Sequence, residues 1–446
     1  MGVLFQAFYW NCPDAEHQDG TWWNFVSGKI PELQQAGFTA LWLPPACKAA
    51  NLGGPSMGYD PYDYYDLGDI AQKGRVKTWF GNQPELVALI NAAHAANIQV
   101  YADLVINHNS GGDAEEQNPI DGNIRWTKFN PGSGKFPRDW TCFHPSFYET
   151  FEGMNFGDMP HLCHRNPHVY EAMIDIARWL IETIGYDGFR FDFVKGYGPW
   201  MVKSIAELRY LNKAEQGFYP FCVGECWDSE RTIDDWLNAI NTFMDNPVSA
   251  FDFPLHYRLK GLCDTFGFSL TNLAQPGAVM QDYPLRAVTF VDNHDTIRDD
   301  NNAIQHDKLM AYSFILTHEG YPSVFWMDWY NFGLAGVGSA SGIAALVAAH
   351  EKFAGGGTQV LFTSDDVYVM QRIGDDSHSG LVYVLNNRGD SWNGARVQTR
   401  WNGVRFDPVA WGGHDNSRPD IKWTQNDGYG DFWAGPRGWA VYTPQS

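Results

Sequence analysis

The feature that most constrains the fold is a regular alternation of short β-rich runs with longer helical patterns. Eight runs are rich in β-branched, aromatic and aliphatic residues, a composition that favours strands. They are Val3–Trp10, Thr39–Pro45, Ile98–His108, Gly188–Val194, Tyr219–Trp227, Ser249–Leu255, Arg286–Asp295 and Tyr321–Met327. Eight strand–helix units predict an α/β fold, the (β/α)8 TIM barrel, in which the carboxyl ends of all strands meet at one face.

The segments between these runs show helical periodicity. In Pro84–Asn97, apolar residues recur at i, i+3, i+4 and i+7, which predicts a helix with one buried face. His168–Ile184 repeats this pattern, and Gly185 follows it as a stop signal.

Two stretches break the alternation. Residues 109–166 are rich in Gly, Pro, Asn and aromatic residues and are too long for a simple loop. From about Gly355 onward the pattern changes to strands and turns, which predicts a C-terminal antiparallel β-sandwich. We therefore expect a barrel at 1–108 and 167–354, a domain inserted after the third strand at 109–166, and a C-terminal domain at 355–446.

Charge and composition restrict the class of partner. The net charge of −21 argues against nucleic acid, whose phosphates require a basic surface, but it would not repel a neutral glucan. The acidity also fits a role in solubility alone. No run of about 18 apolar residues is present to span a membrane. Aromatic residues make up 15% of the chain, including 19 Trp, which fits a carbohydrate ligand although most rings belong to cores.

The cysteines and the N-terminus bear on the compartment. Seven Cys are too few for a disulfide scaffold, and Cys222 and Cys226 lie about 13 Å apart in one extended run, beyond disulfide reach. The chain opens with Met-Gly and continues directly into a strand-like run, so we expect no signal peptide. A cytoplasmic protein and a trimmed secreted protein would look alike here.

Four predicted strands end in polar residues where apolar ones would be sufficient for packing. The polar segments are Asp103–His108, Arg190–Lys195, Gly224–Trp227 and Asp292–Asp295. Because strand ends converge at the mouth of a barrel, acids that are distant in sequence become neighbours there. A single acid of this kind is more often a solvated residue or a helix cap, whereas four polar strand ends together favour a catalytic site.

The types of these residues point to one chemistry. A retaining glycosidase requires two carboxyl groups about 5–5.5 Å apart, one as nucleophile and one as acid/base. Arg190 lies two residues from Asp192 on the same strand face, so we expect it to lower the pKa of Asp192 and keep it ionised. Glu225 lies between hydrophobic neighbours and near two other acids, as expected for the acid/base. Asp295 would face the positive charge that develops on the sugar ring.

These segments, in this order, resemble the motifs of the α-amylase family, glycoside hydrolase family 13. The matching stretches are Asp103–His108, Gly188–Gly196, Val223–Trp227 and Phe290–Asp295, together with Gln6–Trp10 and Gly58–Leu67. The resemblance covers roughly residues 3–350 clearly and the remainder weakly. The run Arg190–Tyr197 is most similar to archaeal and plant types, because Gly196 stands where many relatives carry His.

The resemblance implies a function and roles for individual residues. It implies endo-acting hydrolysis of α-1,4 bonds in starch and maltooligosaccharides, with Asp192 as nucleophile, Glu225 as general acid/base and Asp295 as transition-state stabiliser. It also implies a three-domain fold with an inserted domain B, and we expect a monomer. The substrate-binding residues that it implies are Tyr59, His108, Arg190, Lys195, Trp227 and His294.

Family members generally hold a structural calcium ion between barrel and insertion, and this sequence departs from their pattern. The positions that match calcium ligands are Asn107, Glu152, Met154, His161 and Gly196. Glu152 and His161 stand where Asp is usual, and Met154 falls at a backbone-carbonyl position. Because calcium prefers oxygen ligands, we expect a weakened or absent calcium site.

The same segment holds softer ligands. His144 and Cys163 match positions that bind zinc in some archaeal relatives, and Glu149 stands where the third ligand is usually His. Zinc accepts Glu as a ligand, so a zinc site is one hypothesis. An ordinary histidine-rich loop is the favoured alternative.

Other functions remain open at this point. A transglycosylase of the same family would share every catalytic residue. An enzyme for α-1,6 linkages or short oligosaccharides would differ only in subsite shape. A non-catalytic carbohydrate-binding protein is the remote alternative, because Arg190 and the acids are all present. Starch as substrate implies secretion with the signal peptide removed, and a cytoplasmic location is the alternative.

Overall fold

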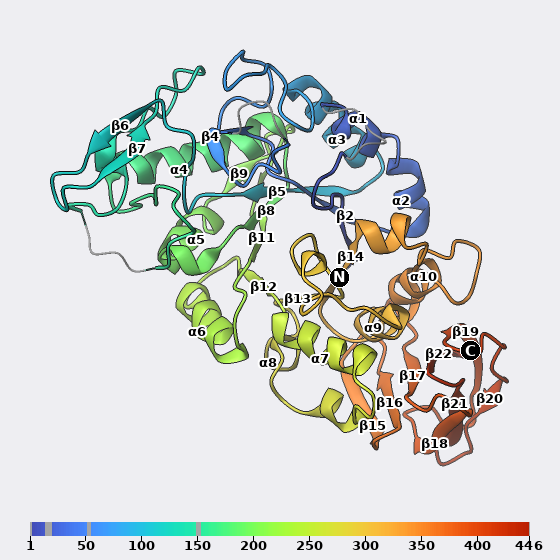
Figure 1. Cartoon of the computed structure of the whole chain (residues 1–446). Helices are drawn as coiled ribbons and strands as arrows, with labels where there is room; N and C mark the ends of the chain where they lie inside the picture. The colour runs from blue at the N-terminus through green and yellow to red at the C-terminus, as the bar shows by residue number, and fades with distance from the viewer. Residues whose placement is uncertain (1, 14–19, 51–54, 149–152, 446) are drawn as a thin grey trace. The chain divides into compact units, whose positions relative to one another are not determined.

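The computed structural model describes residues 2–13, 20–50, 55–148 and 153–445. Its strands include a closed eight-stranded barrel in the order β1-β14-β13-β12-β11-β8-β5-β2 (Figure 1). This order follows the chain around the ring, and the predicted (β/α)8 barrel is confirmed. The barrel strands are β1 (Leu4–Gln6), β2 (Ala40–Leu43), β5 (Gln99–Leu104), β8 (Gly188–Phe191), β11 (Phe221–Gly224), β12 (Ser249–Phe251), β13 (Ala287–Phe290) and β14 (Tyr321–Phe325).

Each barrel strand is shorter than its β-rich run. Strand β8 ends at Phe191 and β11 ends at Gly224, and these two residues are paired in the parallel ladder. Asp192 and Glu225 therefore lie directly beyond the carboxyl ends of neighbouring strands. Phe193 has a φ of 42°, in the left-handed region, and turns the chain out of β8 into the short 3-10 helix η3 (Val194–Gly196).

The barrel helices form where the spacing of apolar residues predicted them. Helix α3 begins after an Asn82–Glu85 capping box and buries the predicted apolar face. Helix α4 passes into the π turn η2 (Leu180–Ile184), which ends at Gly185 with a φ of 108°. The helices are α1 (Trp22–Ser27), α2 (Ile30–Ala36), α3 (Gln83–Ala95), α4 (Pro167–Trp179), α5 (Pro199–Ala206), α6 (Glu230–Asn241), α7 (Phe253–Asp264), α8 (Val279–Asp282), α9 (Lys308–Ile315) and α10 (Ile343–Phe353).

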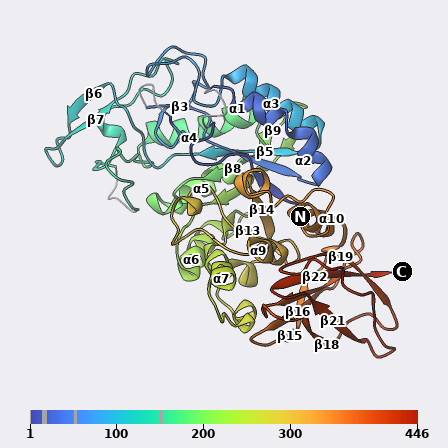
Figure 2. The ribbon, with the colours of Figure 1, turned by 45° about the vertical axis from the view of Figure 1, so that its right-hand side comes forward.

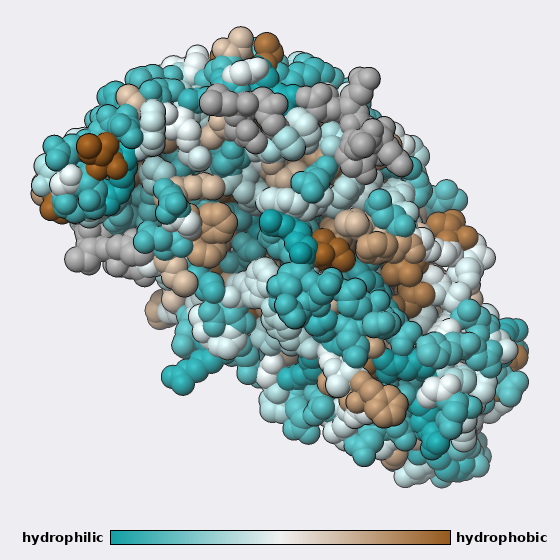
Figure 3. Space-filling model, viewed as in Figure 1, coloured by the Kyte–Doolittle hydropathy of each residue, from teal (hydrophilic) through white to brown (hydrophobic). Residues whose placement is uncertain are grey.

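The chain between β5 and α4 holds an antiparallel hairpin of β6 (Ala114–Gln117) and β7 (Ile124–Lys128), followed by the 3-10 helix η1 (Trp140–Cys142). Ile124 and Trp126 on β7 are more than half exposed. Figure 3 colours hydrophobic residues brown and hydrophilic residues teal, and the face that it shows is mostly hydrophilic with a few brown residues.

The described residues divide into two compact units. The N-terminal unit comprises Ala7–Gln34 and Ala40–Phe251. The C-terminal unit comprises Met1–Gln6, Gln35–Thr39 and Asp252–Ser446.

The C-terminal unit ends in antiparallel sheets, as predicted, with strand order β15-β16-β17-β22-β19-β20 in one and β18-β21 in the other (Figures 1 and 2). Buried Val, Ala, Phe and Tyr side chains form the core between them. The runs Gln359–Thr363, Val367–Ile373, Gly380–Asn386 and Gly438–Thr443 were predicted as strands and correspond to β15, β16, β17 and β22. The other four strands were missed; in β19, Pro408 stands within the strand. The strands are β15 (Thr358–Thr363), β16 (Val367–Arg372), β17 (Leu381–Asn386), β18 (Asn393–Gln398), β19 (Arg405–Gly412), β20 (Lys422–Trp423), β21 (Tyr429–Ala434) and β22 (Gly438–Gln445).

Candidate active site

The centre of the candidate site is the guanidinium of Arg190, which is buried on β8. Its Nη1 donates to Asp103 Oδ1 and to Asp192 Oδ1, both at 2.8 Å. Its Nη2 lies 2.9 Å from Glu225 Oε2. One arginine thus brings together carboxylates from the ends of three neighbouring strands, β5, β8 and β11.

The backbone explains why these acids meet. Asp103 on β5 is the ladder partner of Arg190, so the two side chains start at the same height in the barrel. The Glu225 N–H donates to the Phe191 carbonyl at 2.9 Å, which continues the ladder one residue past β11. The Phe193 N–H then donates to Glu225 Oε2 at 2.9 Å, which is possible because Phe193 takes the left-handed turn.

Asp103 is the most enclosed of the three acids. Its Oδ2 accepts from Tyr59 Oη at 2.8 Å and from Trp42 Nε1 at 3.0 Å. Burial raises the pKa of Asp103 to about 6, although Arg190 and these donors oppose that rise. The place of Asp103 at a strand end is visible in the sequence, but its role is not, because its partners are visible only in three dimensions.

The electrostatics of this group favour acid/base chemistry. Three carboxyl groups face one guanidinium, and the pKa of Arg190 is raised well above its usual value, so Arg190 stays charged. With all three acids ionised the group would carry two excess negative charges in a buried place, so one carboxyl is favoured to hold a proton. A proton-bearing carboxyl beside an ionised one is the pair that retaining glycoside hydrolysis uses.

Two aromatic rings adjoin the acids. Tyr59 stacks on Trp10 with ring centroids 6.0 Å apart and planes 11° from parallel, and both rings are half-buried. The Arg190 guanidinium carbon lies 5.7 Å from the centre of the Tyr59 ring. Such a platform suits the apolar C–H face of a sugar. Trp10 was not predicted as a site residue, although it ends the matching stretch Gln6–Trp10.

His108 is buried behind this platform. Its Nε2 donates to the Tyr59 carbonyl at 2.9 Å, and its Nδ1 accepts from Asn107 Nδ2 at 3.1 Å. Burial lowers the pKa of His108, so the ring is neutral. Phe156 stacks on the ring with centroids 4.8 Å apart. The ring therefore holds the backbone of Tyr59 in place.

Lys195 and Trp227 form a more exposed edge beyond β8 and β11. Lys195 Nζ donates to the Trp227 carbonyl at 2.6 Å and to Asp228 Oδ2 at 3.1 Å. Bonds from the Ser229 backbone N–H and from Lys195 lower the pKa of Asp228 to about 2. These two bonds hold the Lys195 side chain at this edge.

In the C-terminal unit, Asp295 lies in the loop that follows β13. Its carboxylate is 3.1 Å from Arg298 Nη1 and 3.2 Å from His294 Nε2. His294 is buried, and its Nδ1 is hydrogen-bonded to the side-chain amide of Gln6 at 2.9 Å. The Asp295 N–H donates to Asn293 Oδ1 at 2.8 Å, which fixes the turn that carries the carboxylate.

The predicted calcium ligands do not form an oxygen cage in the described residues. His161 Nε2 donates to Asn107 Oδ1 at 2.5 Å, and the same imidazole is hydrogen-bonded to the Gly196 carbonyl. Burial lowers the pKa of His161 to about 3, so this ring is neutral. The Met154 N–H donates to the Lys195 carbonyl at 3.1 Å. Glu152 lies outside the described residues. These groups do not fit calcium, which requires six to eight oxygens.

The predicted zinc ligands are only partly described. Glu149 lies outside the described residues. The His144 ring stacks on His161 with centroids 5.2 Å apart, and burial lowers the pKa of His144 to about 4. Cys163 is buried, and its N–H donates to the Cys142 carbonyl at 2.8 Å. Zinc binding stays a prediction.

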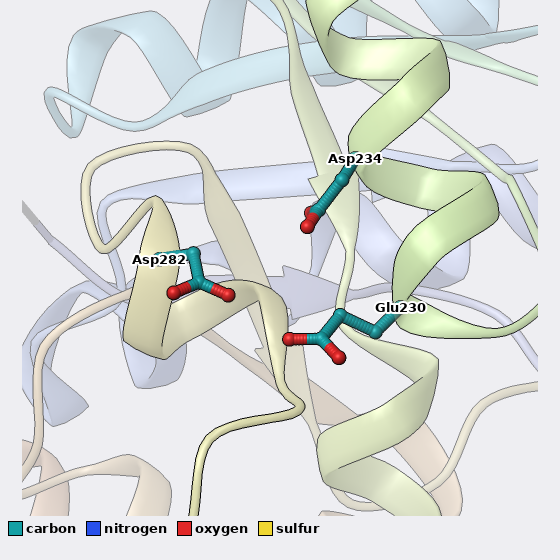
Figure 4. A group of neighbouring side chains, drawn as sticks. All are labelled: Glu230, Asp234 and Asp282. Carbon is teal, nitrogen blue, oxygen red and sulfur yellow. The ribbon is translucent and has the colours of Figure 1, made fainter.

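Carboxylates outside the predicted site also cluster on α6. Glu230 and Asp234 lie four residues apart on one face of this helix, and Figure 4 draws them with Asp282, which ends α8 in the other unit. Acidic groups of this kind could attract a cation, but they are common on proteins without one. These acids were not predicted as site residues from the sequence.

Comparison with known proteins gives a consistent result. A family profile described as "Alpha amylase, catalytic domain" matches residues 14–328. The chain is 30% identical to an α-amylase of Geobacillus stearothermophilus over 100% of this chain and 87% of that protein. It is 29% identical to the cytoplasmic α-amylase of Escherichia coli strain K12, over 87% of this chain and 88% of that protein.

A solved structure shares the fold. The α-amylase of Geobacillus thermoleovorans, crystallised with acarbose, superposes with a TM-score of 0.70 at 20% identity. The match covers 100% of this chain and 98% of that one.

Proposed function

Because the chain belongs to the α-amylase family, glycoside hydrolase family 13, we propose that it hydrolyses internal α-1,4-glucosidic bonds of starch and maltooligosaccharides with retention of configuration. The observation that carries this proposal is the single guanidinium of Arg190, which contacts both Asp192 and Glu225. A pair of acids this close suits double displacement, in which one carboxylate attacks the sugar and the other transfers the proton.

In the first step, Asp192 attacks the anomeric carbon while Glu225 gives a proton to the glycosidic oxygen. The bond to the leaving chain breaks, and a covalent glycosyl ester forms on Asp192. In the second step, Glu225 takes a proton from water, and the water oxygen attacks the same carbon and releases Asp192. Asp295 stabilises the positive charge on the ring in both transition states.

The hydrogen bonds suggest how the two acids are oriented. Asp192 Oδ1 accepts from Arg190, which orients the carboxylate for attack. Glu225 Oε2 is close to two donors, Arg190 Nη2 and the Phe193 N–H, which orient the carboxyl group for proton transfer. The face of Tyr59 would carry the sugar at the cleavage point, with Trp10 stacked on that ring.

The remaining predicted substrate contacts are also proposals. Lys195 and Trp227 would contact the leaving-group side, and His294 would bind a sugar hydroxyl. His108 was expected to do the same, but both its ring nitrogens bond within the protein, so we assign it to holding Tyr59.

Glu225→Gln tests the proposal. The amide cannot give up a proton, so we expect kcat on soluble starch to fall by about 10⁴-fold or more, because the acid and base roles are both lost. Glu182→Gln is a matched control, since Glu182 pairs with Arg178 on the surface and should leave kcat unchanged. Unchanged hydrolysis by Glu225→Gln would disprove the assigned acid.

Product analysis tests the stereochemistry and the acceptor. Proton NMR of early products should show the α-anomer first, because two inversions restore the original configuration. Immediate β-anomer would contradict a covalent intermediate on Asp192. Cyclic or lengthened products would instead indicate a transglycosylase, and faster cleavage of pullulan than of amylose would indicate α-1,6 specificity.

The finer organisation is also a proposal. We propose the barrel at 1–108 and 167–354, domain B at 109–166 and domain C at 355–446. A zinc ion held by His144, Glu149 and Cys163 is a further hypothesis, and metal analysis after dialysis would test it. No catalytic step above requires a metal.

Location and assembly rest on fewer observations. In the described chain, no helix is long and apolar enough to cross a membrane. One relative is cytoplasmic by name, so relatives do not decide the compartment. We propose a secreted monomer; cell fractionation and size-exclusion chromatography would show an intracellular enzyme or an oligomer.

A further inference from the structure

His161 lies where the chain returns from the insertion to the mouth of the barrel. An isolated β-bridge pairs it with His108, just past β5, and its carbonyl accepts from the His144 N–H at 2.8 Å. The side chain is buried, with 4% of the residue exposed. His161 is therefore held by its backbone as well as by its ring.

The imidazole connects two other segments. Its Nε2 donates to Asn107 Oδ1, and the ring is also hydrogen-bonded to the Gly196 carbonyl in η3. The orientation of the Asn107 amide is fixed independently, because its Nδ2 donates to His108 Nδ1 at 3.1 Å. Asn107 Oδ1 must therefore point toward His161.

Gly196 is close to the same oxygen. A Cβ added at Gly196 would overlap Asn107 Oδ1, so only glycine fits there. The Gly196 carbonyl and Asn107 Oδ1 are the two oxygens that would ligate calcium by family resemblance. Here both are satisfied by one histidine side chain.

The geometry leaves no room for an ion between these groups. Calcium binds oxygens at about 2.3–2.6 Å and does not favour imidazole nitrogen. His161 Nε2 and Asn107 Oδ1 are in direct contact at 2.5 Å, so no ion fits between them. Three other histidines, His108, His144 and His164, are titratable neighbours of the ring.

We propose that the His161 imidazole replaces the structural cation, joining the end of β5 to η3 through Asn107 and Gly196, so that the fold needs no calcium. These bonds steady the turn that follows Asp192, because Gly196 closes that turn. The proposal does not depend on which substrate the enzyme cleaves.

The test is urea unfolding followed by tryptophan fluorescence, in EDTA and in millimolar calcium chloride. The wild-type midpoint should be the same in both. His161→Asp supplies a carboxylate beside the two oxygens, so it should be less stable in EDTA and regain stability with calcium. Above its Kd, each tenfold rise in free calcium should raise the folded-to-unfolded ratio about tenfold.

His164→Asp is the matched control. His164 is equally buried, but its Nε2 donates to the Ile106 carbonyl at 2.9 Å instead. The same substitution there should lower stability in EDTA and in calcium alike. A calcium response equal to that of His161→Asp would show that any buried acid in this segment binds calcium.

Two results would overturn the proposal. One is a wild-type midpoint that falls in EDTA, and the other is a folded His161→Asp variant with no calcium response. If His161→Asp does not fold, equilibrium dialysis of the wild type against calcium decides the matter: one tightly bound ion per chain contradicts the proposal, and none supports it. Neither readout uses hydrolysis, so failure of the proposed activity would remain separate.

Discussion

The substitution Asp103→Asn removes one negative charge from the group around Arg190 while keeping the size of the side chain. Asp103 uses both oxygens as acceptors: Oδ1 for Arg190, and Oδ2 for Tyr59 and Trp42. Asn has one oxygen, so its NH2 must face a buried donor whichever way the amide turns.

The structure sets the size of the effect. A buried donor left without an acceptor costs about 1–3 kcal/mol. Arg190 keeps Asp192 and Glu225 as partners, so at pH 7 we expect a loss in this range rather than the larger loss for breaking an isolated buried pair. We also expect kcat to fall by roughly 10- to 100-fold, because a displacement of Arg190 by about 1 Å would misplace Asp192 and Glu225, the two acids that we propose react.

The pH dependence has a definite sign. Burial raises the pKa of folded Asp103 to about 6 from its usual value of 3.8, so the folded state binds the proton more tightly. The wild type therefore loses stability as the pH rises from about 4 to about 6, and the Asn variant lacks this loss. The stability difference between the two should be larger at pH 5 than at pH 7.

The assay is urea unfolding at pH 5 and pH 7, together with kcat on soluble starch. Asp252→Asn is the control, because Asp252 is also buried with its pKa raised to about 6 but accepts only from the backbone around α7 and α8. It should lose stability without losing kcat. If Asp103→Asn kept both wild-type stability and wild-type kcat at pH 7, Asp103 would not hold Arg190 in the position that the two other acids require.

Two further predictions concern the aromatic platform and a buried histidine. Trp10→Ala should raise KM for maltooligosaccharides by about 3- to 10-fold and change kcat less, because the Tyr59–Asp103 bond remains; an unchanged KM would exclude the platform. Burial lowers the pKa of His318 to about 3 from 6.5, and both ring nitrogens are bonded, to the Phe314 carbonyl and to Tyr368 Oη. The contribution of this neutral ring to stability is fully present above pH 6.5. As the pH falls below 6.5, the unfolded state takes up a proton that the folded state does not, so the free energy of unfolding falls by about 1.4 kcal/mol per pH unit. His318→Gln should reduce the slope of the free energy of unfolding against pH, between pH 4 and 6, by the equivalent of about one bound proton. An unchanged slope would contradict this.

Local patterns in the sequence were sufficient for the architecture. Strand-like runs, the buried face of α3 and the stop at Gly185 each depend on residues close together in the chain. The strand ends were placed too late, because residues such as Glu225 keep a β-like neighbourhood after the strand has ended. Hydrophobic period reports burial, but it does not report where a strand leaves the barrel.

The sequence by itself determined the barrel and which acids follow its strands, because periodicity and strand order are properties of the chain. Only the tertiary structure decided which partners these acids have. It joined Asp103, Asp192 and Glu225 through Arg190, and it turned His161 toward Asn107. The physical reason is that hydrogen bonds are directional and act over about 3 Å. The ladder register and the turns beyond each strand therefore determine which side chains come within that distance, and spacing in the sequence does not.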